Sequence, residues 1–476
     1  VPINERLTDP EVESILNGIR VQMADRIRRT DLEALEHLGR SEIFGVVARE
    51  TQNISQAAAT LVMALQATMM VIFSVAYLAI LSKTAFFITV VVASVSITLH
   101  LRRLKALTAM LGEAQRKENE FLTLLTHLIE GFKEVRMRRS RSTDLFQDLR
   151  EVSVSVQEIK TATGSEFSAH YIFAQMIFYA LLAAIVFLLP RLGTEYSTVV
   201  LKLTAAILFI IGPLASIVSS FPVYSAANVG AQNLFDIEDK LTASSAPEQN
   251  GRPEATSPAQ FKRIEIKRAV YQYTDRGSGS VFRLGPIDLE VNAGEMLFIV
   301  GGNGSGKSTL LRILTGLYHS QSGSITMDGT LISQETAVWY RSHFAVVFSE
   351  YHLFDRLYGL GNVPAERVNE MLQLMQLTDK TAYKNGRFTS LDLSHGQRKR
   401  LALLVALLED RPILVLDEWA ADQDPPFRRF FYEELLPQLK QQGKAIVAVT
   451  HDDKYFDRAD RVVKMEYGEF VSSGRG

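Results

Sequence analysis

The residues with the clearest chemistry lie in a glycine-rich stretch at 301–309, GGNGSGKST. This stretch fits the phosphate-binding loop pattern G-x-x-x-x-G-K-[ST]. Glycine lets the backbone wrap closely around phosphate oxygens, because no Cβ stands in the way and the N–H groups can point inward. In this pattern Lys307 reaches the β- and γ-phosphates of a nucleotide, and the Ser308 hydroxyl binds Mg²⁺. The predicted contact residues are Gly301, Asn303, Gly304, Ser305, Gly306, Lys307, Ser308 and Thr309.

Two carboxylates follow a second apolar segment further along the chain. Residues 413–416 read as a buried strand that ends in Asp417 and Glu418. Asp417 would hold Mg²⁺ through its water shell, and Glu418 is placed to orient or deprotonate an attacking water. The pair lies about 110 residues after the phosphate loop, in the order that an ATPase sheet requires. The loop itself has the matching strand–loop–helix setting, since residues 295–300 predict a strand and residues 309–314 a helix.

Composition excludes several classes of function. The formal net charge of -2 gives no bulk electrostatic attraction to nucleic acid, so no nucleic-acid partner is expected. The chain has no cysteine, which excludes disulfides, thiolate metal sites and cysteine nucleophiles. Its 476 residues are enough for more than one domain.

The first half of the chain contains four long runs without charge. The runs are residues 51–82, 84–101, 167–190 and 203–232. Each has at least ~18 residues, enough to cross ~30 Å of hydrocarbon as a helix. The expected membrane spans are about 56–81, 84–101, 169–190 and 203–226. Short gaps within each pair indicate two helical hairpins, so the sequence predicts a multi-pass membrane protein.

Lysine and arginine placement predicts the orientation. Basic residues precede the first hairpin and crowd the segment 102–166, whereas the hairpin turns carry few charges, among them Lys83 and the pair Arg191 and Glu195. By the positive-inside rule, both termini and the segment 102–166 are cytoplasmic. The phosphate loop then lies in the compartment that contains ATP.

Changes in composition divide the chain into three parts. Residues 1–240 predict an α-helical transmembrane domain, with 102–166 extending two membrane helices into the cytoplasm. Residues 241–260 are rich in Ser, Pro and Ala and predict a linker. Residues 261–476 alternate strand and helix patterns, as expected for an α/β nucleotide-binding domain.

A third motif lies between the phosphate loop and the carboxylate pair. Residues 393–397, LSHGQ, are similar to the LSGGQ signature of ATP-binding cassette (ABC) ATPases. In that family the signature contacts the γ-phosphate held by the opposite subunit. The resemblance implies that Ser394, Gly396 and Gln397 complete the site of a second copy. The chain is therefore expected to act as a dimer, most simply a homodimer, with ATP and Mg²⁺ as its cofactors.

The same resemblance assigns further residues. Tyr273 resembles the aromatic residue that stacks on adenine, with Tyr271 as the alternative. Asp424 matches the D-loop aspartate, and His451 matches the switch histidine that senses the γ-phosphate. The expected catalytic residues are Glu418, His451 and Lys307. The expected Mg²⁺ ligands are Ser308, Asp417 and Ser349. The family usually has glutamine where this chain has Ser349, which has less reach, so Glu350 or a water is an alternative for that role.

Longer segments narrow the resemblance to one branch. Residues 347–359, 393–412 and 417–461 resemble ABC half-transporters that export cyclic peptides and siderophores, of the pyoverdine and syringomycin types. This branch implies ATP-driven export of a peptide or siderophore across the bacterial inner membrane, in contact with membrane lipids. A flippase for lipid or lipopolysaccharide precursors is the alternative. A soluble ABC ATPase conflicts with the four spans, and a degenerate ATPase subunit conflicts with the intact motifs.

Two features concern the membrane half. The branch has six helices, and the first ~50 residues resemble the cytoplasmic segment after the second helix, so we expect that the first hairpin is missing; a genuine four-helix form is the alternative. Polar and aromatic residues form stripes that face either a substrate cavity or a packed helix. The stripes are Gln66, Met70, Ser74 and Tyr77; Tyr171, Gln175 and Tyr179; and Ser216, Ser220 and Tyr224.

Overall fold

The computed structural model describes residues 3–188, 199–243, 261–274 and 281–471. Contacts between residues group the chain into two compact units. The first unit comprises Val1–Arg26 and Gly39–Lys240, and the second comprises Ile27–Leu38 and Leu241–Gly476. The chain therefore enters the second unit twice. Most of the predicted linker, from 244 to 260, and the turn residues Arg191 and Glu195 lie outside the described residues.

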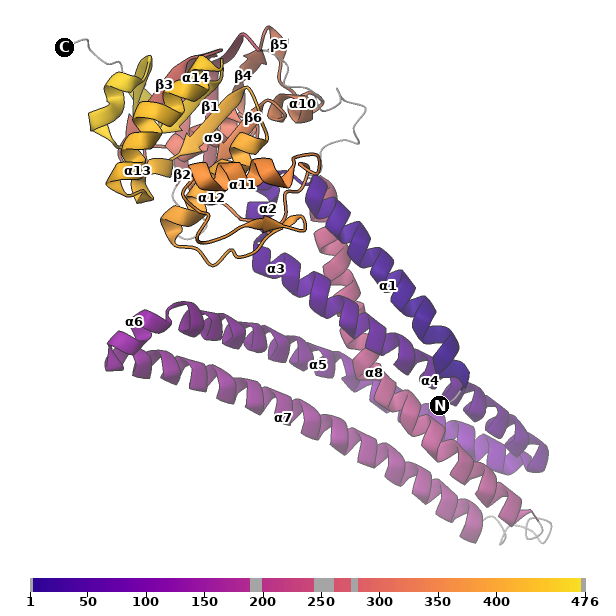
Figure 1. Cartoon of the computed structure of the whole chain (residues 1–476). Helices are drawn as coiled ribbons and strands as arrows, with labels where there is room; N and C mark the ends of the chain where they lie inside the picture. Colours follow the sequence, from indigo (N-terminus) through magenta and orange to yellow (C-terminus); the bar gives the residue numbers. More distant parts are fainter. Residues whose placement is uncertain (1–2, 189–198, 244–260, 275–280, 472–476) are drawn as a thin grey trace. The chain divides into compact units, whose positions relative to one another are not determined.

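The first unit is helical throughout its described part. In chain order its elements are α1 (Ile3–Arg29), α3 (Arg40–Gly45), the π-helix η1 (Val46–Glu50), α4 (Thr51–Leu81), α5 (Lys83–Glu130), α6 (Phe132–Met137), α7 (Arg139–Ala183), the π-helix η2 (Ala184–Leu188) and α8 (Val200–Ala243). Figure 1 shows α5 and α7 running side by side, with α6 at the turn between them. The polar segment 102–166 thus forms the far ends of two long helices and their connection.

Two helices of the described chain are long and apolar enough to cross a membrane. They are α4 and α8, each of which contains a long, strongly apolar segment. Shorter apolar stretches lie at Lys83–Ser96 and Gln175–Leu188. Only 17% of the apolar segment of α4 and 22% of that of α8 are buried. Large apolar side chains on α4 consequently remain exposed, and such a surface is suited to lipid or to another protein chain.

One end of the membrane unit has its own apolar core. Leu78 on α4, Phe178 on α7, and Leu203 and Ile207 on α8 are almost completely buried against one another. The turn between α4 and α5 is closed by Ser82, whose Oγ accepts a hydrogen bond from the Ala85 N–H at 3.3 Å. The N-cap satisfies a backbone donor that the start of a helix leaves without a partner. This core holds the two helical hairpins together.

The second unit combines sheets and helices. Its helices are α2 (Leu32–Leu38), α9 (Lys307–Leu314), α10 (Ala337–Arg341), α11 (Ala365–Leu374), α12 (His395–Leu408), η5 (Trp419–Asp422), α13 (Pro425–Phe430), η6 (Phe431–Leu435), α14 (Leu436–Gln441) and η7 (Asp453–Arg458). Its strands are β1 (Arg263–Thr274), β2 (Val281–Asn292), β3 (Met296–Gly301), β4 (Ser322–Met327), β5 (Thr330–Leu331), β6 (Phe344–Val347), β7 (Tyr383–Lys384), β8 (Arg387–Phe388), β9 (Ile413–Asp417), β10 (Ala445–Val449), β11 (Arg461–Glu466) and β12 (Glu469–Val471).

The larger sheet has the order β12-β11-β3-β10-β9-β6, and its strands from β11 to β6 are parallel. Strands β9 and β10 are buried along their whole length, which explains their uninterrupted apolar sequences. Two apolar cores cover the faces of this sheet. In parallel sheets, ligands bind at the carboxyl ends of the strands. Strands β3, β10, β9 and β6 therefore deliver their following loops to one edge.

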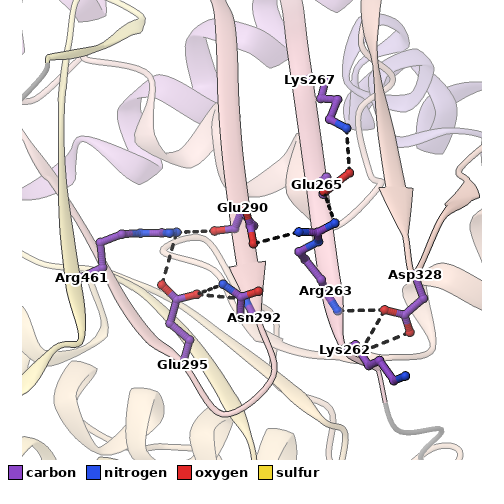
Figure 2. A network of polar contacts seen from close by, with 9 residues as sticks. All are labelled: Lys262, Arg263, Glu265, Lys267, Glu290, Asn292, Glu295, Asp328 and Arg461. Atoms are coloured by element: carbon purple, nitrogen blue, oxygen red, sulfur yellow. Dashed lines mark hydrogen bonds and ion pairs between the residues drawn. The ribbon is translucent and has the colours of Figure 1, made fainter.

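A second, antiparallel sheet has the order β2-β1-β4-β5. Figure 2 shows the polar network that joins it to the larger sheet. Arg461 on β11 donates to the Glu290 carbonyl of β2 and pairs with Glu295 at 3.4 Å. Glu295 in turn accepts from the Asn292 N–H at 2.9 Å, just before β3 begins. The Arg461 side chain in this pair is open to solvent, and ion pairs in contact with water contribute about 0–1 kcal/mol each, so the buried cores supply most of the stability.

Candidate active site

The predicted phosphate loop lies between the end of β3 and the start of α9. Gly301 has φ 153° and Gly306 has φ 100°. A Cβ at Gly301 would lie 2.1 Å from the Met465 carbonyl oxygen, and one at Gly306 would lie 2.8 Å from a Leu284 methyl group. Both positions therefore require glycine, for backbone conformation and for space. The N-terminus of α9 directly follows the loop, and its free N–H groups favour an anion there.

Lys307 is buried, with 5% of its side chain exposed. Its Nζ donates to the carbonyls of Gly301 at 3.0 Å and Gly302 at 2.9 Å, and it lies 3.8 Å from Glu418 Oε1. Within the described chain, the Ser305 hydroxyl is buried without a hydrogen-bond partner. An unpaired buried hydroxyl is costly, and a phosphate oxygen is a suitable partner for it. The loop thus fits a nucleotide phosphate.

Asp417 ends β9 and is 1% exposed. Its Oδ2 accepts a hydrogen bond from Ser349 Oγ at 3.0 Å, whereas its Oδ1 is buried with no partner among the described residues. Ser349 follows β6, which pairs with β9 in the sheet. A buried carboxylate oxygen without a donor, beside a hydroxyl, provides the hard oxygen ligands that Mg²⁺ binds. These residues therefore fit a Mg²⁺ ion.

Glu418 and His451 meet beyond the ends of neighbouring strands. His451 Nε2 lies 3.1 Å from Glu418 Oε1. Glu418 has φ 49°, a left-handed conformation that is unfavourable for a residue with a side chain. Its backbone is held in place by its N–H, which donates to the Val449 carbonyl at 3.1 Å, and by its carbonyl, which accepts from Lys399 Nζ at 2.8 Å. Strained residues of this kind concentrate at functional sites.

The two candidate adenine-stacking tyrosines differ in burial. Tyr271 is 1% exposed, stacks on Tyr318 with ring centroids 4.9 Å apart, and donates its hydroxyl to Glu33 Oε1 at 3.0 Å. Burial and this carboxylate raise the pKa of the Tyr271 phenol. Tyr273 is 40% exposed. Tyr273 therefore has surface accessible to a base and Tyr271 has almost none, which makes Tyr273 the better candidate of the two.

The signature residues form a separate group. Ser394 caps α12 by accepting from the Gln397 N–H at 3.4 Å, and Gln397 Oε1 accepts from the Ser394 N–H at 3.0 Å, which makes a capping box. A Cβ at Gly396 would lie 2.6 Å from the Asp422 carbonyl oxygen. Asp422 belongs to residues 419–424, which directly follow Glu418 in the chain. Within the described chain, none of the hydrogen bonds of the signature residues runs to the phosphate loop.

Asp424, the predicted D-loop aspartate, belongs to this second group. Its Oδ1 accepts from the Phe427 N–H at 3.0 Å and caps α13, and its Oδ2 pairs with Arg400. The hydrogen bond from Phe427 and the Arg400 guanidinium lower the pKa of this carboxyl. The predicted residues thus fall into two sets, one around the phosphate loop and one around the signature.

Two basic residues that the sequence analysis did not assign belong to the signature set, and one of them, Lys399, also binds Glu418. Lys399 is 4% exposed; it binds the Glu418 carbonyl and pairs with Asp422 at 2.6 Å. Arg400 is 7% exposed, binds Gln423 Oε1 at 2.8 Å and stacks on the Phe427 ring at 3.7 Å. The signal available in the sequence was the basic run that directly follows LSHGQ. Two of its members lie on the buried face of α12, where charged residues need partners.

Comparison with known proteins identifies the family of the chain. Residues 284–421 match the family described as ABC transporter. The ATP-binding protein SyrD of Pseudomonas syringae pv. syringae is 34% identical over 470 residues, which cover 96% of this chain and 82% of SyrD. The probable syringafactin export ATP-binding/permease protein SyfD of Pseudomonas syringae pv. syringae (strain B728a) is 33% identical over 213 residues, which cover 41% of this chain and 32% of SyfD.

Similarity also extends to lipid transporters and to a solved exporter structure. An ATP-dependent lipid A-core flippase of Paraburkholderia xenovorans (strain LB400) is 25% identical over 483 residues, covering 97% of this chain and 78% of the flippase. The structure of a bacterial Atm1-family ABC exporter with ATP bound superposes with a TM-score of 0.80 at 15% identity, covering 97% of this chain and 82% of that one. This confirms the predicted fold class, a helical membrane domain followed by an α/β ATPase domain. The chain belongs to the ABC transporter family, as an inner-membrane exporter whose cytoplasmic ATPase domain binds ATP and couples its hydrolysis to transport.

Proposed function

We propose that this exporter carries a peptide or a siderophore, in the form of a cyclic peptide, a lipopeptide or a siderophore precursor. The observation that carries the proposal is the higher identity to SyrD, 34% over 470 residues, than to the lipid A-core flippase, 25% over 483 residues. It agrees with the sequence resemblance to the peptide and siderophore branch. The similarity of the ATPase part to a probable syringafactin export protein supports the same class.

The membrane helices offer suitable side chains for an amphipathic cargo. Tyr179 and Tyr224 are 49% and 58% exposed, although they lie on apolar stretches of α7 and α8. Gln175 Nε2 donates to the Tyr179 hydroxyl at 3.3 Å, so this part of the predicted stripe on α7 forms a single polar group. Ser220 and Tyr224 of α8 line a cavity of about 230 Å³ together with Thr60 of α4. Polar groups on membrane helices are costly against lipid and are typical of substrate pathways.

Glu418, His451 and Lys307 are proposed to act on ATP. Glu418 would take a proton from the attacking water, and His451, at 3.1 Å from that carboxylate, would contact the γ-phosphate and hold Glu418 in place. Lys307 would transfer its hydrogen bonds from the loop carbonyls to phosphate oxygens. Tyr273 would stack on adenine. Lys307 and Glu418 already lie at the phosphate loop, and His451 contacts Glu418.

The proposed metal site consists of the Ser308 hydroxyl, Asp417 and Ser349. Bound there, Mg²⁺ would supply positive charge to the phosphate oxygens. Ser349 holds Asp417 Oδ2 at 3.0 Å, which leaves the partnerless Oδ1 for the ion or its water. Ser349 therefore acts in part through Asp417 in this proposal.

The proposed active form is a homodimer. Ser394, Gly396, Gln397 and Asp424 lie in a set of contacts separate from the phosphate loop, so they would complete the loop of a second copy. ATP would then bind the closed dimer more tightly than the open one and shift the membrane helices between two states. Hydrolysis would allow the dimer to reopen.

The experiment that tests the cargo uses the purified protein in lipid vesicles. We expect acylated peptides or peptide siderophores to stimulate ATP hydrolysis and to be carried across the bilayer, and lipid A-core to do neither. Stimulation and movement of lipid A-core alone would favour the flippase function. Alanine at Gln175 and Tyr179 should remove the stimulation by peptide. If that variant is stimulated as strongly as the wild type, the polar group on α7 is not part of the cargo path.

A further inference from the structure

The loop that follows Glu418 and the loop that contains His451 are joined by a single arginine side chain. We propose that Arg428, on α13, is a positioning residue that sets the separation of Glu418 and His451 for ATP hydrolysis. The inference rests on the catalytic roles proposed above for those two residues. It assigns Arg428, with Asp452 and Tyr432, a role that the sequence motifs do not give them.

On one side Arg428 binds the loop after Glu418. Its Nε donates to the Ala420 carbonyl at 3.2 Å, and one of its terminal nitrogens donates to the carbonyls of Ala421 at 2.9 Å and Gln423 at 3.1 Å. These carbonyls lie two, three and five residues after Glu418 along the chain. A guanidinium group presents its donors in a fixed plane, so three acceptors bound together fix the course of the loop.

On the other side Arg428 binds the residue next to His451. Its second terminal nitrogen lies 3.3 Å from Asp452 Oδ1. The other oxygen of that carboxylate, Oδ2, accepts from the Tyr432 hydroxyl at 3.0 Å. Tyr432 is 1% exposed, and its hydroxyl also lies 2.6 Å from Thr450 Oγ1. Thr450 Oγ1 also accepts from the Asp452 N–H at 3.1 Å. Thr450 and Asp452, the residues on either side of His451, are therefore both hydrogen-bonded to the buried Tyr432 hydroxyl.

The strands explain why such a link is needed. β9 and β10 are paired up to Asp417 and Val449, and one further backbone bond joins Glu418 to Val449. Beyond that point the two strands are no longer paired, and the 3.1 Å contact between Glu418 and His451 is made by their side chains. The ion pair of Arg428 with Asp452 provides a second link between the two loops. A displacement of about 1 Å at a catalytic group can cost about 100-fold in rate.

The test compares Arg428→Gln, Arg428→Lys and Asp452→Asn in the whole exporter in lipid vesicles. The matched control is Arg429→Gln, which removes the same charge from the exposed neighbouring residue. We expect kcat for ATP to fall about 10- to 100-fold in Arg428→Gln and Asp452→Asn, with KM and melting temperature close to wild type. Arg428→Lys should recover little of the loss, because an ammonium group cannot bind both loops in one plane. Arg429→Gln should retain the wild-type kcat.

A double-mutant cycle separates positioning from a general effect on folding. The double variant Arg428→Gln with Asp452→Asn should lose no more kcat than the stronger single variant, because both changes break one link. Independent losses that multiply would overturn the proposal, as would a kcat within twofold of wild type in Arg428→Gln. If Arg428→Gln does not fold, the proposal is tested with Asp452→Asn alone, and a kcat of that variant within twofold of wild type overturns it. Glu418→Gln in the same assay distinguishes the failures: if it still hydrolyses ATP normally, the catalytic assignment is wrong, whereas its inactivity beside an active Arg428→Gln refutes only the role of Arg428.

Discussion

His451 Nε2 lies 3.1 Å from Glu418 Oε1, and the same carboxylate oxygen lies 3.8 Å from Nζ of Lys307. Three groups from different parts of the sequence therefore meet at one atom. His451 follows β10, Glu418 follows β9, and Lys307 begins α9 after β3. Because these strands are neighbours in a parallel sheet, the fold brings their carboxyl ends to one place without long connecting loops.

The first prediction concerns Glu418→Gln. The amide retains the size of the side chain and a hydrogen bond to His451, but it cannot take a proton from water. We expect ATP binding close to wild type and a kcat lower by a factor of about 100 to 10,000. Steady-state hydrolysis and nucleotide binding measured on the same preparation check this. Glu433→Gln, an exposed substitution on η6, is the control. Near-normal hydrolysis by Glu418→Gln would eliminate Glu418 as the general base.

The second prediction distinguishes Ser349 from Glu350. Ser349→Ala removes the donor to the buried Asp417 Oδ2, so the carboxylate loses its orientation. We expect the Mg²⁺ concentration needed for half-maximal hydrolysis to rise about 10-fold, as for other losses of a group that orients a metal ligand. Ser349→Thr keeps the hydroxyl and should stay near wild type. If Glu350→Gln raises this Mg²⁺ concentration and Ser349→Ala does not, Glu350 rather than Ser349 supports the metal site.

The third prediction concerns the two tyrosines at the end of β1. Tyr273→Ala should raise the KM for ATP about 10-fold, since stacking of an aromatic ring on a base contributes about 1–3 kcal/mol. Tyr273→Trp should restore it. Tyr271→Phe retains the buried ring and loses only the bond to Glu33, so its KM should not change. If Tyr271→Phe changes the KM for ATP and Tyr273→Ala does not, Tyr271 rather than Tyr273 contacts the adenine.

The motifs were sufficient to predict the elements around the phosphate loop. Strand β3, helix α9 and strand β9 follow from apolar runs next to glycine and carboxylate signals. The choice between Tyr271 and Tyr273 could not be made from the pattern, because residues two apart on a strand point to the same face. Their difference in burial depends on Tyr318 and Glu33, which are distant in the sequence. The roles of Lys399 and Arg428 could not be predicted either. Their partners are backbone carbonyls of a loop, and these carbonyls come within hydrogen-bond distance only when the chain is folded.

No pattern in the sequence indicates that residues 27–38 belong with the ATPase domain. This segment is polar and helical, like the residues around it, and the sequence analysis therefore assigns it to the membrane domain, which is predicted to end at residue 240. The structure groups it with the second unit, where α2 contacts tyrosines of the ATPase domain. The contact joins residues more than 200 positions apart in the chain. Hydrophobic periodicity describes only neighbouring residues, so it cannot predict such a contact.

The last prediction concerns this contact of α2. The Tyr318 hydroxyl donates to Glu36 Oε2 at 2.5 Å, and Arg312 of α9 donates to the same hydroxyl at 2.8 Å. Burial and Glu36 raise the pKa of Tyr318 to about 12. Because this pKa lies above the ordinary value of about 10, the phenol's contribution to stability is complete below pH about 10 and is lost as pH rises through about 12.

At neutral pH the bond between Tyr318 and Glu36 is therefore intact, and it ties the phosphate-loop helix to a segment that continues into the membrane unit on both sides. We expect Tyr318→Phe and Glu36→Gln to keep basal ATP hydrolysis within about twofold and to lose most of its stimulation by transported substrate, because binding energy at one site reaches the other only through differential contacts. Parallel assays of basal and stimulated hydrolysis in vesicles measure both. Tyr358→Phe, which removes an exposed hydroxyl of the same unit, is the control. Equal loss of basal and stimulated rates would assign the contact to stability, and unchanged stimulation would show that α2 does not couple transport to hydrolysis through Tyr318.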